Sequence, residues 1–191
     1  MVLNDRTILE GEKDIYLSKK IDQGYKSIYL EPFPKVNPRV IDEINTSDLI
    51  VIGPGGLHTS IIPNLLVSGV SQAICDSGAK KIYIMNLMNR TGQTTGYKVS
   101  DYVKELAQFL GRDVLDYILI NNQSPPEDLI QIYSEEGDLI ENDLLDDPRV
   151  IQANLLGSLK DAPVKDLIKR NLIRHDSHKL AHELMKIVDN L

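Results

Sequence analysis

The sequence has no tryptophan and only one cysteine, Cys75, among its 191 residues. A single cysteine excludes an internal disulfide and cannot by itself form a metal site. No apolar run is long enough to span a bilayer, and the first residues lack the profile of a signal peptide. These absences predict a cytoplasmic protein with no membrane partner.

Positive charge is also scarce, since 21 lysines and arginines face 28 acidic residues and give a formal net charge of −7. This balance disfavours nucleic acid as a partner bound through a broad basic surface. It remains compatible with a small anionic ligand held in one local basic pocket. The apolar and charged fractions, 42% and 26%, are those of an ordinary globular protein.

Short apolar segments alternate with helical patterns along the chain, which predicts βαβ units and a largely parallel sheet. We expect strands at 27–30, 49–52, 81–85 and 114–120, the last three buried on both faces. We expect helices after Asn37-Pro38, from about 100 to Gly111, after a capping box at Ser124–Glu127, and from Asp176 with Leu191 on its inner face.

In an open α/β sheet the ligand lies beyond the carboxyl ends of the strands, so the loops there are the candidate site. The first loop, residues 53–60, reads GPGGLHTS and leads into a helix. Its glycines and free N–H groups suit a phosphate, and Thr59 or Ser60 could donate to one. A tight turn whose Thr or Ser only caps the helix fits this pattern equally well.

The second loop, residues 86–96, is rich in amides and hydroxyls that could contact a base, a sugar or a phosphate, and Arg90 adds positive charge. A flexible surface loop is the alternative, although its position directly after a buried strand favours binding. In a third segment, Arg174 offers a planar fork of donors for a diphosphate, and His175 could shuttle a proton.

His178 and His182 have the spacing of an HxxxH metal pair, but their phase indicates a solvated helix face, and we expect no metal there. The candidate ligand-binding residues are Gly53, Pro54, Gly55, Gly56, Thr59, Ser60, Asn64, Asn86, Gln93, Thr94, Arg174 and His175, and no catalytic residue is assigned.

Three motifs resemble the CofD-like family, in particular its gluconeogenesis-factor branch. DLIVIGPGGLHTSIIPNLLVSGV is similar to the branch's GPGSLYTSIIPNLLV, KIYIMNLMNRTGQTTGYKVSDYV to its NLMTQPGETDGYSASDHV, and LIRHDSHKLAHEL to its Arg-His-Asp ending. Gly56 and His58 stand where the branch has Ser and Tyr, and Arg90 stands where it has Gln. The resemblance implies a Rossmann-like three-layer α/β sandwich with a mainly parallel sheet.

The resemblance also implies that residues 1–191 are a single α/β domain. We expect them to correspond to the C-terminal part of a longer CofD-like domain, as a fragment or as a shortened protein, because nothing here matches the family's N-terminal GGGTG loop. The function implied is a regulatory protein that binds a UDP-sugar and supports cell shape and cell-wall homeostasis during gluconeogenic growth.

The alternative is a 2-phospho-L-lactate transferase-like enzyme with a deazaflavin acceptor, which would need Mg²⁺. No cofactor is otherwise expected, and assembly as a homo-oligomer is left open.

Overall fold

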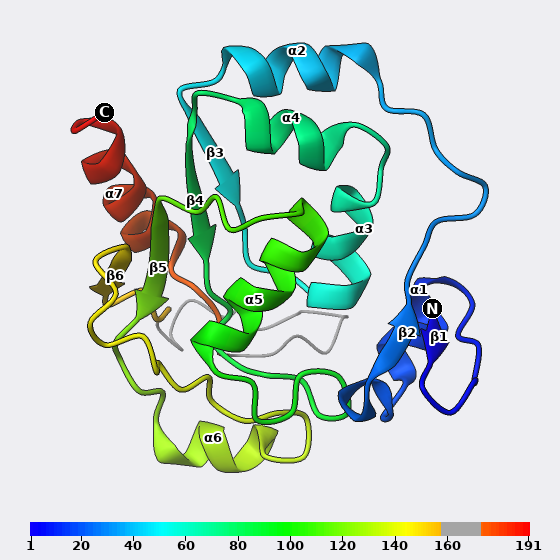
Figure 1. The fold of residues 1–191 in the computed structure, drawn as a ribbon. Helices are drawn as coiled ribbons and strands as arrows, with labels where there is room; N and C mark the ends of the chain where they lie inside the picture. Colours follow the sequence, from blue (N-terminus) through cyan, green and yellow to red (C-terminus); the bar gives the residue numbers. More distant parts are fainter. Residues whose placement is uncertain (158–172) are drawn as a thin grey trace, which may run out of the picture.

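The computed structural model describes residues 1–157 and 173–191, and its centre is a four-stranded sheet in the order β3-β4-β5-β6 (Figure 1). All neighbouring strands run parallel, which confirms the predicted mainly parallel sheet. The strands are β3 (Leu49–Ile52), β4 (Lys80–Ile84), β5 (Tyr117–Asn121) and β6 (Val150–Ala153).

Helices connect and cover these strands. They are α2 (Pro38–Thr46) before β3, α3 (Ile62–Leu65) and α4 (Val70–Asp76) before β4, α5 (Val99–Leu110) before β5, α6 (Glu127–Tyr133) before β6, and the C-terminal α7 (Ser177–Val188). As predicted, the Asn37 side chain caps α2 by accepting from the Arg39 N–H. In the described parts of the chain, no helix combines the length and apolarity needed to cross a membrane.

Side chains of β4 alternate between the two faces of the sheet and so define three layers. Tyr83 and Met85 belong to the core that includes α5, whereas Ile82 and Ile84 pack in a second core with Ile187 of α7. Figure 1 shows α5 in front of the sheet and α7 behind it. The α/β three-layer sandwich predicted for the chain is therefore present.

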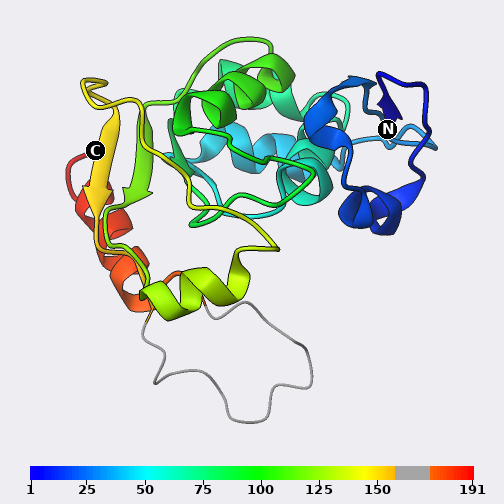
Figure 2. The ribbon, with the colours of Figure 1, turned by 90° about the horizontal axis from the view of Figure 1, so that it is seen from below.

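An N-terminal unit lies beside the sheet, on the side of the molecule away from α7 (Figure 2). It contains β1 (Val2–Leu3) and β2 (Tyr25–Ser27), which pair antiparallel, with α1 (Gly11–Leu17) and the short helix η1 (Ile21–Gln23) between them. The Ile21 N–H donates to the Gly92 carbonyl at 2.8 Å, and the Tyr25 hydroxyl donates to Glu105 on α5. These bonds attach the unit to the loop after β4 and to α5.

Several predicted boundaries differ from the structure. The strand expected at 27–30 is β2, which ends at Ser27 because it pairs with only two residues of β1, while Ile28 turns into the core. β5 begins at Tyr117 rather than at 114. Leu191 is 51% exposed, because α7 ends at Val188 before another turn can bring it inward.

The capping box predicted at Ser124–Glu127 was wrong. α6 begins at Glu127, and Pro126 occupies the cap position with extended backbone and no side-chain cap. The residue before a proline is kept out of the helical region, so Pro126 prevents Pro125 from serving as the first helical residue that the capping box required.

β3 is less buried than its apolar sequence predicted. Within the described residues it pairs only with β4 and forms the edge of the sheet, which leaves Val51 44% exposed. A continuously apolar strand predicts burial in the interior of a sheet. Whether strands also pair on both of its edges depends on the tertiary structure, which the strand's own sequence does not show.

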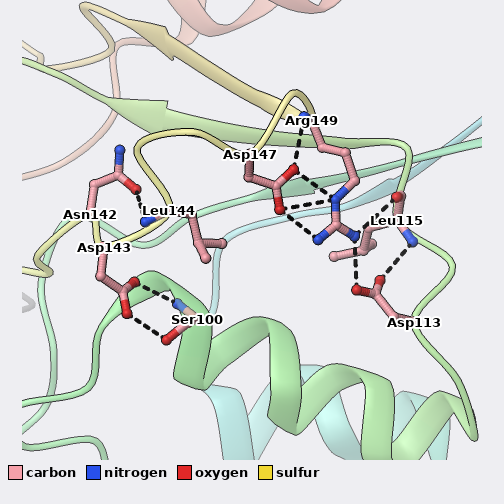
Figure 3. A network of polar contacts seen from close by, with 8 residues as sticks. All are labelled: Ser100, Asp113, Leu115, Asn142, Asp143, Leu144, Asp147 and Arg149. Carbon is pink, nitrogen blue, oxygen red and sulfur yellow. Dashed lines mark hydrogen bonds and ion pairs between the residues drawn. The ribbon is translucent and has the colours of Figure 1, made fainter.

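A polar network fixes the end of the sheet where β5 and β6 begin (Figure 3). Arg149 directs its guanidinium at Asp147 (2.7 Å) and at Asp113 (2.8 Å), which joins the turn before β6 to the turn before β5. The hydrogen bonds from Arg149 hold the pKa of the Asp147 carboxyl below its ordinary value. At the opposite end of α5, Asp143 accepts from the N–H and the hydroxyl of Ser100 in the first turn of that helix (Figure 3).

We expect Arg149→Met to lower the free energy of unfolding by about 1–2 kcal/mol at neutral pH, because two carboxylates lose their donor. A carboxyl with a lowered folded-state pKa adds stability above its unfolded pKa and loses it as the pH falls through the folded value. The difference from wild type should therefore shrink below about pH 4. Urea denaturation at several pH values measures it.

Lys186→Met is the matched control, since it removes only an exposed pair with Glu183 on α7. Its effect should stay below about 0.5 kcal/mol at every pH. An Arg149→Met effect that is equally small, or that does not change with pH, would contradict the role of the network.

Candidate functional site

The first loop leaves β3 and enters a π-helical turn, η2 (Leu57–Ile61), that continues into α3. The N–H groups of Ser60 and Ile61 both donate to the Gly56 carbonyl, at 2.8 Å and 3.1 Å. A Cβ on Gly56 would collide with Oγ1 of Thr59, so this glycine permits the close turn. The hydroxyl-bearing residues Thr59 and Ser60 are thereby held at the carboxyl end of β3.

Asn86 joins the first loop to the second. Its Oδ1 accepts from the Gly55 N–H and its Nδ2 donates to the Gly55 carbonyl, both at 2.9 Å. The side-chain amide thus imitates a neighbouring strand and holds the two loops side by side. Since the Gly55 N–H is used here, donors to an anion must come from other groups of the loops.

Buried polar side chains shape the second loop. Asn89 Nδ2 donates to the Tyr97 carbonyl and to Asp138, while its Oδ1 accepts from the Tyr102 hydroxyl. Thr94 is 4% exposed, and its Oγ1 accepts from the Arg90 N–H. Burial is the main cause that raises the pKa of Tyr102 to about 12, so this hydroxyl stays a donor. Asn89 and Thr94 therefore serve the architecture of the loop.

Gln93 links the second loop to the N-terminal unit. It is 2% exposed, and its Nε2 donates to the carbonyls of Ile15 (3.2 Å) and Tyr16 (2.9 Å) at the end of α1. The loop after α6 packs on the other side, where the Asn89 N–H donates to the Asp138 carbonyl at 2.7 Å. The second loop is therefore enclosed between α1 and the segment after α6.

These segments surround a cavity of about 310 Å³, which we call the loop cavity. The Arg90 guanidinium lies 3.6 Å from the centre of the Tyr16 ring, which is a cation–π contact between two residues that line the cavity. Two acidic residues, Glu12 and Glu136, also line the cavity. Predicted site residues on this cavity are Gly56, Thr59, Ser60, Asn86 and Gln93.

Other predicted residues lie elsewhere. Gly53, Pro54, Gly55 and Asn64 line a separate cavity of about 410 Å³ along β3, which Ser60 also touches. The Asn64 amide donates to the Ser60 carbonyl at 2.7 Å and supports that turn. The structure therefore divides the predicted first-loop residues between two cavities.

Arg174 and His175 do not line the loop cavity. The Arg174 carbonyl accepts from the Gly157 N–H, and the Asp176 N–H donates to the Leu155 carbonyl, which fixes this segment beside the end of β6. Burial lowers the pKa of His175, partly opposed by a hydrogen bond with the Met85 backbone. Asp176 caps α7 as predicted, by accepting from the N–H groups of His178 and Lys179.

Sequence reasoning missed Glu12, Tyr16 and Glu136, which come from segments with no binding motif. Their place on the cavity follows from the packing of α1 and of the loop after α6, and no local pattern signals it. As for metals, no three His, Cys, Asp or Glu side chains gather into a metal-binding group within residues 1–157 and 173–191. His178 and His182 are exposed on α7.

The chain is similar to several known proteins. The family described as "2-phospho-L-lactate transferase CofD" matches residues 1–156. A putative gluconeogenesis factor of Thermotoga maritima is 41% identical over 188 residues, covering 93% of this chain and 56% of that protein. The gluconeogenesis factor of Bacillus subtilis is 34% identical over 189 residues, covering 97% of this chain and 56% of that protein.

A crystal structure of a UPF0052-family protein from Bacillus halodurans matches with a TM-score of 0.79 and 29% identity, over 96% of this chain and 57% of that one. This likeness supports the Rossmann-like architecture. The chain spans little more than half the length of these relatives.

We expect Asn86→Ala to lower the free energy of unfolding by about 1–3 kcal/mol, because the N–H and carbonyl of Gly55 lose both partners. Amide hydrogen exchange at Gly55 should become faster than in wild type, while exchange in the core strand β4 changes less. Asn190→Ala is the control, since its amide only donates to the Lys186 carbonyl at the exposed end of α7. Unchanged exchange at Gly55 would show that the loops hold together without Asn86.

Proposed function

This chain belongs to the CofD-like family that includes the gluconeogenesis factors, and we propose that it binds a nucleotide-linked ligand, with a UDP-sugar the favoured class, in the loop cavity. In this proposal the chain acts as a regulatory binding protein and performs no chemistry. The cellular role proposed is that of the branch it resembles, in cell shape and cell-wall homeostasis during gluconeogenic growth.

The observation that carries the proposal is the polar wall of the loop cavity at the carboxyl ends of β3 and β4. There the cavity is lined by Thr59, Ser60, Asn86 and Arg90. Ligands of open α/β sheets bind at this edge. Hydroxyls, an amide and a guanidinium are suitable donors to phosphate oxygens, and the guanidinium can contact two oxygens at once.

The two carboxylates of the cavity, Glu12 and Glu136, fit the remainder of such a ligand. A carboxylate accepts hydrogen bonds from hydroxyl groups, which a ribose and a second sugar both offer. The same carboxylates disfavour a ligand that is negatively charged throughout. The wall therefore suits a molecule with a phosphate part and a hydroxyl-rich part.

A transferase of the 2-phospho-L-lactate type is the second candidate, and the description of the matching family favours it. A thermal-shift screen separates the two functions with UDP-sugars, GDP and a deazaflavin, each with and without Mg²⁺. The binding proposal expects the largest stabilisation from a UDP-sugar, with or without Mg²⁺, because a bound ligand raises stability with its affinity. Stabilisation only by GDP or deazaflavin with Mg²⁺ would favour the transferase.

We expect Arg90→Ala to weaken UDP-sugar binding by about 10–100-fold, since a charge-assisted contact contributes about 1.5–3 kcal/mol. Arg90→Lys should recover only part of this loss, because lysine keeps the charge without the planar fork. Isothermal titration calorimetry measures both. The melting temperature without ligand should change little, because Arg90 leaves its backbone hydrogen bonds in place when the side chain is removed.

Arg39→Ala is the matched control, an exposed arginine on α2 that does not line the loop cavity. It should bind the UDP-sugar as wild type does. Wild-type affinity in Arg90→Ala, together with a lower melting temperature, would make the contact with Tyr16 purely structural.

A further inference from the structure

The two edges of the sheet differ in polarity. Among the described residues, β3 pairs only with β4 and β6 pairs only with β5, so both are edge strands (Figure 1). β6 carries the polar Gln152 at its exposed position, whereas β3 reads Leu-Ile-Val-Ile and leaves Val51 44% exposed. Proteins normally protect an edge strand with charged residues, proline or a bulge, because an apolar edge pairs with other chains. β3 has none of these and carries the sequence of an interior strand.

The side chains of β3 remain accessible along the whole strand. None of its four residues is buried, although all four are apolar. In β4, by comparison, every residue after Lys80 is buried. The cavity of about 410 Å³ along β3 is lined in part by Val51 and Ile52, and a second hollow, of about 470 Å³, is lined in part by Leu49 and by Val40 of α2. The free edge therefore presents an apolar surface on which another chain can pack.

The backbone of β3 also has hydrogen-bonding groups directed at this edge. The Asp48 carbonyl accepts from the Lys80 N–H at the start of β4. Because backbone groups alternate in direction along a strand, those of Leu49 and Val51 point away from β4. The side chains of these two residues lie on the face of the sheet that α7 covers, since Leu49 packs against that core. A chain that covers the edge must therefore supply backbone partners and apolar contacts on that face.

The relatives indicate what kind of chain fits there. They match nearly all of this chain, yet the chain spans little more than half their length, so they carry a portion with no counterpart in residues 1–191. Helices α4 and α5 pack in the core on one face of the sheet. Right-handed crossovers place the helices of a sheet half that grows in the other direction on the opposite face. That face is the one on which Val51 is exposed.

We propose that the free edge of β3 is the docking site for a strand–helix unit of the portion that the relatives carry outside their match to this chain. The apolar strand of that unit pairs parallel with β3 and extends the sheet, and its helix covers Leu49 and Val51. Parallel sheets are stable in this form because helices cover both faces. The proposal does not rest on nucleotide binding, and its test contains no nucleotide.

Co-expression tests the docking. The part of the Thermotoga maritima factor outside its match to this chain is produced as a tagged polypeptide together with this chain. We expect the two polypeptides to co-purify as a complex. Amide hydrogen exchange at Leu49 and Val51 should be about tenfold slower or more in the complex than in the chain alone, because exchange then requires the docked strand to detach. Exchange at Gln152 on the other edge should not change.

Two matched variants assign the contact to β3. Val51→Lys places a charge at the exposed position of the apolar edge and should weaken the complex by about tenfold or more, since a lysine on an edge strand opposes pairing. Gln152→Lys places the same charge at the exposed position of β6 and should form the complex as wild type does. Both side chains are exposed, so the melting temperature of either variant without the partner should stay close to that of wild type.

Several outcomes would overturn the proposal. These are the absence of a complex, a complex without slower exchange at Leu49 and Val51, or an equally stable complex with folded Val51→Lys. A dimer of this chain alone that protects the same two amides and excludes the added polypeptide would make a second copy the occupant and also overturn it. If Val51→Lys does not fold, exchange in the wild-type complex still tests the contact. Loss of UDP-sugar binding in Arg90→Ala bears only on the loop cavity.

Discussion

The paired hydrogen bonds between the Asn86 amide and the backbone of Gly55 connect the two loops on which the candidate site depends. Parallel strands bring their carboxyl ends to one edge of the sheet, but they do not determine how the loops beyond that edge meet. A side-chain amide can donate and accept at once, so one asparagine satisfies both backbone groups of Gly55. The position of Thr59 and Ser60 relative to Arg90 follows from this contact.

The second loop shows how polar residues divide between architecture and binding. Asn89, Gln93 and Thr94 are buried with their hydrogen bonds made inside the protein, because an unpaired buried polar group costs free energy. Arg90, whose guanidinium rests on Tyr16, keeps its charge at the cavity wall.

Local sequence patterns predicted the elements whose causes are local. The Asn37-Pro38 helix start, the Asp176 cap and the Gly111 stop of α5 are confirmed, because each depends on a hydrogen bond or a backbone angle within a few residues. The apolar strands β3 and β4 lie where their sequences predicted. The predicted cap of α6 was wrong because the two prolines outweighed the capping residues. The predicted burial of β3 was wrong because, among the described residues, only one of its edges is paired.

The sequence by itself determined the parallel α/β sheet, the loops beyond its strands and the family to which the chain belongs, since periodicity and motifs are carried by neighbouring residues. Only the tertiary structure decided which loop residues face a cavity, because burial depends on segments distant in the chain. The Gln93 amide donates to backbone carbonyls of α1, and the His58 ring is completely buried by packing against Tyr25 and beside Glu105. Contacts between residues 77 or 33 positions apart leave no periodic trace in a sequence, so neither outcome could be read there.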